Sequence, residues 1–140
     1  FATLDPSSRR LKFPKETEVI ITDTVGFIKN IPKDLLVAFR ATLEELKNAD
    51  LLLHVIDIGN PRFEDQVESV ERILSDLNLN KIPMLRIFNK QDLVKKEIVE
   101  NLCRFYDSIP ISANNESTLA PLIKKMEYSI ESICTKHPET

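Results

Sequence analysis

The stretch Val19-Ile20-Ile21-Thr22-Asp23-Thr24-Val25-Gly26-Phe27 decides the fold that we predict for this chain. A run of mostly β-branched apolar residues ends in an acid, Asp23, and Gly26 follows three residues later. This order is typical of a buried strand that brings a carboxylate and a turn to the carboxyl edge of a sheet. Ligands of open α/β sheets bind at that edge. We therefore expect the later strands and loops of the chain to meet at the same edge.

Strand-like and helix-like segments alternate along the rest of the chain. Strands are predicted at residues 11–13, 18–22, 51–56, 83–88 and 109–111, and residues 1–10 are expected to be loop. The strand at 51–56 is continuously apolar and is expected to be buried on both faces. Helices are predicted to begin at Pro32 and at Asn60-Pro61, and two more helices follow. The apolar stripe of the first of these two contains Val94, Ile98, Leu102 and Phe105. This alternation indicates βαβ units and a single α/β domain.

Composition limits the classes of function. The chain has 140 residues, 42% hydrophobic and 29% charged, which is typical of one folded domain. No apolar run approaches the ~20 residues of a membrane span. The net charge of −3 argues against a broad nucleic-acid surface. Cys103 and Cys134 lack metal or redox spacing, so reduced thiols and a cytoplasmic location are expected.

Residues 89–92 form the pattern N-K-x-D after the predicted strand at 83–88. The carboxylate of Asp92 only accepts hydrogen bonds, so it matches the two donors on the N1 and N2 edge of guanine, and adenine lacks that pair. Ser112-Ala113 follows one βα unit later, where a backbone N–H can reach the guanine carbonyl. Ordinary turn chemistry is the alternative for Asn89 and Asp92. The D-x-x-G at 23–26 and the S-A at 112–113 favour a guanine site.

Four further strings carry a resemblance to a known family. They are Phe1-Ala2-Thr3-Leu4-Asp5-Pro6, Thr22-Asp23-Thr24-Val25-Gly26-Phe27-Ile28, Ala38-Phe39-Arg40-Ala41-Thr42-Leu43-Glu44-Glu45 and Leu51-Leu52-Leu53-His54-Val55-Ile56-Asp57. Over nearly its whole length the chain resembles a P-loop GTPase, and closely the HflX family. The resemblance implies a three-layer α/β GTPase domain at residues 1–134, with a mostly parallel sheet and one antiparallel edge hairpin, and a polar tail at 135–140.

Members of the HflX family are ribosome-associated GTPases that act on the large subunit and can split ribosomes under stress. The resemblance therefore implies GTP or GDP and Mg²⁺ as cofactors and the large ribosomal subunit as partner. We expect a monomer without a membrane span. Thr3 and Gly26 would be catalytic, since Thr3 would close on Mg²⁺ and the γ-phosphate, and Gly26 would offer its N–H to that phosphate. Asp23 would hold Mg²⁺ through water, so Thr3 and Asp23 form the implied metal set. The implied nucleotide-binding set is Asn89, Lys90, Asp92, Ser112, Ala113, Asp23 and Gly26.

Phe27 stands where Ras-type GTPases carry a glutamine that orients the attacking water. A phenyl ring cannot orient water, so we expect slow intrinsic hydrolysis that a partner stimulates.

A phosphate-binding loop of the form G-x-x-x-x-G-K-S/T needs glycines, and the only two here are Gly26 and Gly59. The chain begins in the family pattern at switch I, so we expect an excerpt of a GTPase without its first strand, phosphate loop and first helix. Such a fragment should be inactive and bind GTP barely. One rearrangement that we expect is direct pairing of the strands ending at Thr22 and starting at Leu51.

Three alternatives stay open. One is a fragment of a neighbouring GTPase family such as Obg or Era. Another is a degenerate GTPase-like module that docks on the ribosome or RNA without hydrolysis. The third, an α/β domain of receiver or flavodoxin type, has no need for N-K-x-D followed by S-A.

Overall fold

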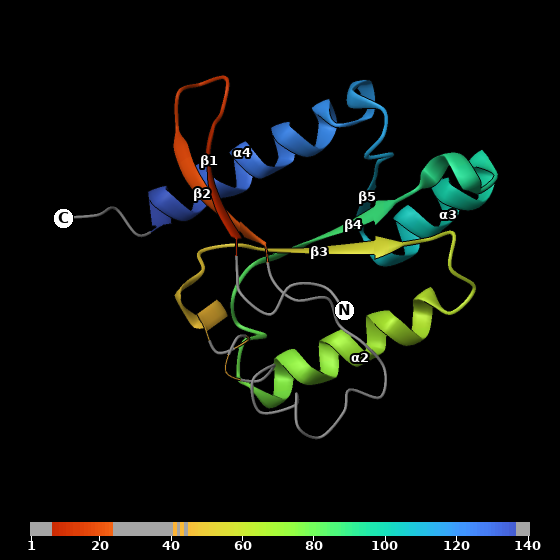
Figure 1. Cartoon of the computed structure of the whole chain (residues 1–140), viewed down its shortest axis with the longest axis horizontal. Helices are drawn as coiled ribbons and strands as arrows, with labels where there is room; N and C mark the ends of the chain where they lie inside the picture. The colour runs from red at the N-terminus through yellow and green to blue at the C-terminus, as the bar shows by residue number, and fades with distance from the viewer. Residues whose placement is uncertain (1–6, 24–40, 42, 44, 137–140) are drawn as a thin grey trace.

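The computed structural model describes residues 7–23, 41, 43 and 45–136. Its elements in chain order are β1 (Ser7–Lys12), β2 (Glu18–Asp23), η1 (Glu45–Asn48), β3 (Leu52–Asp57), α2 (Phe63–Asp76), β4 (Met84–Asn89), η2 (Gln91–Leu93), α3 (Lys96–Tyr106), β5 (Ser108–Pro110), η3 (Glu116–Thr118) and α4 (Ala120–Lys136). In Figure 1, α2 and α4 lie on opposite sides of the strands. Strands between helical layers on both sides are the three-layer arrangement that the sequence predicts.

The described strands form two sheets. β3, β4 and β5 are parallel neighbours, with Leu52 opposite Met84 and Arg86 opposite Ser108. β1 and β2 form a separate antiparallel pair. A mostly parallel sheet with one antiparallel hairpin confirms the predicted fold class. The direct pairing of β2 with β3 does not occur, because each belongs to a different sheet.

The face of the sheet that meets α2 and α3 holds two clusters of buried apolar residues. One contains Ile56, Ile58, Val67, Phe88 and Val99, and the other contains Leu52, Val70, Leu74 and Leu79. Side chains alternate along a strand, so Leu52, His54 and Ile56 of β3 share this face. His54 is opposite Arg86 in the register of β3 and β4, and these two polar residues separate the clusters.

Arg86 ties three elements together on this face. Its Nη2 donates a hydrogen bond to Oε1 of Glu71 on α2, and the two also form an ion pair. Its Nη1 donates to the carbonyl oxygen of Tyr106 in the last turn of α3 at 2.6 Å. The guanidinium also lies 5.6 Å from the centre of the Tyr106 ring, where a cation is attracted to the aromatic face. The arginine therefore joins α2, β4 and the end of α3.

The apolar sequence of β3 predicted burial on both faces, and this prediction was wrong. Val55 is 56% exposed, although Leu52 and Ile56 on the α2 side are buried. Ile20 and Ile21 of β2 are exposed as well. Among the described residues, the helices cover β3 on the side of Leu52 only. An apolar run therefore predicts a strand, but it does not predict whether another layer covers the second face of that strand.

Several predicted boundaries also differ, and those of β2, β3 and β4 differ by one residue. β1 begins at Ser7, inside the expected loop at 1–10, because Ser7 to Lys12 pair with Asp23 to Glu18. α2 begins at Phe63 instead of Pro61, because the Asn60 side chain accepts the backbone N–H of Arg62 at 2.9 Å and closes a turn before the helix. β5 covers Ser108–Pro110 instead of the predicted residues 109–111.

The helix expected from Pro32 lies mostly outside the described residues, but Leu43 is fully buried and packs on Leu46, Ile73 and Leu77.

The predicted apolar stripe of α3 was right for Val94 and Leu102, which pack on the buried cluster, and wrong for Ile98 and Phe105. Ile98 is exposed and Phe105 is 80% exposed. Val99 is buried instead, and Leu102, Cys103 and Tyr106 pack on its cluster. Both stripes have helical spacing, so the packing against Phe88 and Phe63 decides which one faces the sheet. The rings of Phe88 and Tyr106 meet edge to face at 5.7 Å.

Candidate functional site

The loops that follow β4 and β5 are joined by the side chain of Asn89. Asn89 is the last residue of β4 and lies opposite Asp57 at the end of β3. Its Oδ1 accepts the backbone N–H of Lys90 at 2.8 Å and that of Ala113 at 3.0 Å. One amide oxygen therefore fixes the first turn of the N-K-x-D loop and ties it to the S-A loop. The structure thus brings together two stretches that lie more than twenty residues apart in sequence.

Asp92 and Ser112 make a second link between the same loops. The Ser112 hydroxyl donates to Oδ1 of Asp92 at 3.0 Å. Ser112 is 6% exposed, whereas Asp92 is exposed. A carboxylate has about four acceptor positions on its two oxygens, so Asp92 can hold Ser112 and still accept from a ligand. An acceptor of this kind is what the predicted guanine site requires.

Backbone hydrogen bonds fix the positions at which the two loops leave β4 and β5. The N–H of Ile111 donates to the carbonyl of Phe88 at 2.7 Å, and the N–H of Gln91 donates to the carbonyl of Ile111 at 3.1 Å. These bonds continue the pairing of β4 and β5 beyond Pro110. The two loops therefore leave the sheet side by side, anchored on the fully buried Phe88.

Lys90 adopts a left-handed backbone conformation, with φ of 66°. Its Nζ lies 3.0 Å from Oδ2 of Asp57, and Oδ1 of Asp57 accepts the N–H of Gly59 at 2.8 Å. The ammonium group therefore reaches back across the ends of β3 and β4. A non-glycine residue in this conformation is uncommon and costs free energy, so the surrounding hydrogen bonds hold Lys90 in place.

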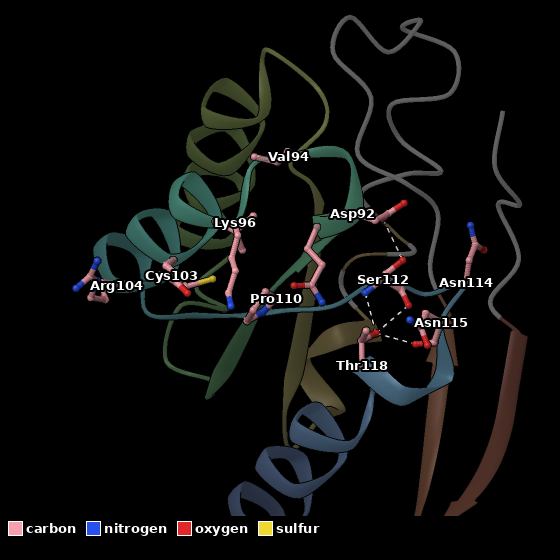
Figure 2. Close-up of a pocket in the computed structure, with 13 residues that line it drawn as sticks. Asp92, Val94, Lys96, Cys103, Arg104, Pro110, Ser112, Asn114, Asn115 and Thr118 are labelled. Carbon is pink, nitrogen blue, oxygen red and sulfur yellow. Dashed lines mark hydrogen bonds between the residues drawn. The ribbon is translucent and has the colours of Figure 1, made fainter.

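A groove of about 980 Å³ lies beside these loops. Figure 2 shows it running between α3, which contributes Cys103 and Arg104, and the segment from Pro110 to Thr118. Asp92 and Ser112 line the groove, but Asn89, Lys90 and Ala113 do not. The groove therefore borders the site at the Asp92–Ser112 link. Burial raises the pKa of the Cys103 thiol, so less of it is in the reactive thiolate form.

Sequence reasoning missed three residues that support the site. The Thr118 hydroxyl accepts the N–H of Ser112 and lies 2.9 Å from the Ser112 carbonyl oxygen, to which it can donate. Asn115 starts η3 by accepting the N–H of Ser117. Asp57 holds Lys90, as described above. Asp57 was discoverable, because it follows an apolar strand as Asp23 does; the role of Thr118 depends on loop geometry that no local pattern shows.

The residues implied for the phosphate and metal end are only partly described. Thr3 and Gly26 lie outside the described residues. Asp23 is exposed at the end of β2, opposite Ser7. It therefore belongs to the hairpin and not to the sheet that carries the N-K-x-D loop (residues 89–92) and the S-A loop (residues 112–113), which we call the base loops. Among the described residues, no group of three or more His, Cys, Asp or Glu gathers to hold a metal ion. No helix in the described part of the chain is long and apolar enough to cross a membrane.

Comparison with known proteins agrees with the geometry. Residues 1–90 match the family model described as "50S ribosome-binding GTPase". The curated protein "GTPase HflX" of Caldanaerobacter subterraneus subsp. tengcongensis is 46% identical over 93% of this chain and 29% of its own length. "GTPase HflX" of Alkalihalophilus pseudofirmus is 43% identical over 94% of this chain and 30% of its own. A crystal structure of an SsGBP mutation variant matches with a TM-score of 0.79 and 26% identity, covering 94% of this chain and 49% of that one.

The α/β fold, with N-K-x-D and S-A loops joined at the carboxyl ends of parallel strands, is that of the P-loop GTPase class. The chain belongs to the 50S ribosome-binding GTPase family, and it is similar to the curated GTPases named HflX. It spans about 30% of the length of these two curated relatives.

Proposed function

We propose that this chain is the base-reading and switch-bearing part of a GTP-binding, GTP-hydrolysing factor of HflX type. The observation that carries the proposal is the double link between the loops, Asn89 to Ala113 and Asp92 to Ser112. Each link uses one of the side chains that the family pattern assigns to guanine. Held in this way, the loops present their polar groups to a base without having to order on binding, which reduces the entropic cost of binding.

Base recognition follows from the donors and acceptors of the two loops. The Asp92 carboxylate accepts from guanine N1–H and the N2 amine, and the N–H groups of the S-A loop donate to the guanine carbonyl. The aliphatic part of the Lys90 side chain, held by Asp57, provides a flat apolar contact for the ring. Adenine would place an acceptor against the Asp92 carboxylate, so its binding is disfavoured.

At the phosphate end, the proposed residues are Thr3, Asp23 and Gly26. Mg²⁺ is usually held by one or two carboxylates together with waters and substrate phosphates, so the single exposed carboxylate of Asp23 fits the role of a water-mediated metal contact. Bound Mg²⁺ would neutralise the charge of the β- and γ-phosphates. Phe27 offers no group to orient water, so slow hydrolysis that the partner accelerates is proposed.

The phosphate-binding loop is the part of the site that the 140 residues do not supply, because Gly26 and Gly59 are their only glycines. The separation of the β1–β2 hairpin from the β3–β4–β5 sheet supports the view that a strand belongs between them. The exposure of Val55 and Ile20 supports the view that a covering helix is missing as well. We therefore propose that residues 1–140 alone bind GTP barely and that hydrolysis belongs to the intact protein.

The proposed partner is the large ribosomal subunit, with ribosome splitting or rescue under stress as the task, carried out in the cytoplasm by a monomer. The family description, which names binding to the 50S ribosome, supports the ribosomal partner. A docking module that binds ribosomes or RNA without hydrolysis, or a GTPase of Obg or Era type, would differ in nucleotide turnover or in the adjoining domains.

The test is a change of base specificity in the protein expressed from the whole gene. In Asp92→Asn, an amide replaces one acceptor by a donor, so affinity for GDP should fall at least tenfold while affinity for xanthosine diphosphate, which has a carbonyl at position 2, should rise. Asp76→Asn at the end of α2 is the matched control and should change neither affinity. Calorimetry that shows no preference of the unaltered protein for GDP over ADP, or micromolar GTP binding by residues 1–140 alone, would contradict the proposal.

A further inference from the structure

The tip of the β1–β2 hairpin, residues 13–17, is attached to helix α4 by a buried carboxylate. The backbone N–H of Lys15 donates to Oε2 of Glu127 at 2.9 Å. The Lys15 Nζ also lies 3.9 Å from Oε1 of Glu131, one helical turn further along α4. Glu127 is only 6% exposed. Burying a carboxylate is costly unless hydrogen bonds compensate it, so this contact joins specific atoms and is not an incidental touch between surfaces.

The tip is itself well defined. Phe13 is 2% exposed, whereas nearly all residues of β2 are exposed. The N–H of Phe13 donates to the carbonyl of Thr17 at 2.9 Å, and the N–H of Glu16 donates to the carbonyl of Phe13 at 2.8 Å. Figure 1 shows the hairpin beside α4, as the Lys15–Glu127 bond requires. The position of the tip on α4 therefore sets the position of the hairpin.

The opposite end of the hairpin carries Asp23. Six residue pairs connect the two ends, from Lys12 opposite Glu18 near the tip to Ser7 opposite Asp23 at the open end. The hydroxyls of Ser8 and Thr22 are 3.0 Å apart and link the strands near this end. At ~3.4 Å per residue, the hairpin spans about 17 Å. A small rotation about the tip therefore moves the Asp23 carboxylate by a larger distance.

Helix α4 is fixed to the base loops at its own start. It begins at Ala120, directly after η3, and the Thr118 hydroxyl of η3 is bonded to the backbone of Ser112. From Ala120 to Glu127 the helix makes about two turns, and the hairpin tip is attached there. One rigid element thus connects the loop that would read the base with the hairpin that would approach the phosphates.

We propose that Glu127 is a positioning residue for the γ-phosphate end of the site: it holds the hairpin tip on α4 and so sets where Asp23 stands relative to Asp92 and Ser112. This inference rests on the proposed function. GDP depends on the base loops and the phosphate loop, whereas GTP with Mg²⁺ also depends on the open end of the hairpin. Loss of the Glu127 contact should therefore weaken GTP binding selectively.

The experiment measures the affinities of GDP and of a non-hydrolysable GTP analogue, both with Mg²⁺, in the protein expressed from the whole gene. Glu127→Leu should weaken the analogue about fivefold or more, in the range typical of coupled sites, and leave GDP within twofold. Glu127→Gln keeps an acceptor for the Lys15 N–H and should restore the analogue affinity to within twofold. Glu97→Leu, at an exposed position on α3, is the matched control and should change neither affinity.

Glu127→Asp provides a second variant in case Glu127→Leu fails to fold. It retains the charge but is one methylene shorter, so it pulls on the tip or loses the bond, and it should lower the analogue affinity without lowering that of GDP. Equal losses for both nucleotides, or an unchanged affinity ratio in folded variants, would overturn the positioning role while leaving the proposed function intact. Failure of the unaltered protein to bind either nucleotide would overturn both.

Discussion

His54 should make the folded chain less stable in mild acid. Burial, and secondarily the nearby Arg86 guanidinium, lower the pKa of His54 from 6.5 to about 4. Among the described residues, its Nδ1 is buried without a hydrogen-bond partner. The charged group that acts on it is Arg86, its neighbour on β4, which is ion-paired with Glu71 on α2. Arg86 is a cation and offers no acceptor to an imidazolium.

The sign follows from the number of protons bound in each state. Between pH 6.5 and 4 the unfolded chain protonates His54 and the folded chain does not, so protons favour unfolding. Above pH 7 both states are neutral at this position and the contribution vanishes. As the pH falls, the free energy of unfolding should drop by about 2 kcal/mol at pH 5 and about 3 kcal/mol at pH 4 from this residue.

The assay compares urea unfolding of the unaltered chain with that of His54→Asn, which keeps a polar side chain but cannot be protonated in this range. Carboxylates titrate in both proteins, so their effect cancels in the difference between the two unfolding free energies. That difference should shift by about 2 kcal/mol in favour of His54→Asn between pH 7 and pH 5. A difference that stays constant with pH would refute the reasoning and would mean that the folded state accommodates the imidazolium.

Two other predictions concern the base loops and the hairpin tip. Asn89→Ala removes the acceptor of two backbone N–H groups and should lower the free energy of unfolding by about 1–3 kcal/mol; hydrogen exchange at the Lys90 and Ala113 amides should accelerate, and unchanged rates would contradict the linking role of Asn89. Glu16 has φ of 73°, so Glu16→Gly should raise the free energy of unfolding by about 0.5 kcal/mol. Urea unfolding measures this second change, and a decrease would show that the turn is unstrained.

The sequence allowed the sheet and the base loops to be predicted, because both depend on local chemistry. The largely apolar runs of β3 and β4 favour strands, and the Asn89 to Asp92 pattern after β4 favours a loop at the carboxyl end of the sheet. The link from Thr118 to Ser112 was missed because it depends on how η3 folds back. No local sequence pattern predicts that η3 folds back beside Ser112.

The face of α3 could not be predicted for a different physical reason. Ile98 and Phe105 have the same helical spacing as Val99 and Tyr106, so periodicity alone supports either stripe. The ring of Phe88 and the cation–π contact from Arg86 select Tyr106. The exposure of Val55 is a similar case, because an apolar strand residue is buried only where another layer covers it.

The polar pair of His54 and Arg86 has a consequence for how the domain opens. It interrupts the apolar contacts between the cluster around Phe88, below the base loops, and the cluster around Leu74, at the other end of the strands. Groups without shared contacts unfold with little energetic coupling. We therefore expect the carboxyl end of the sheet to keep its protected amides while the far end of α2 opens and closes.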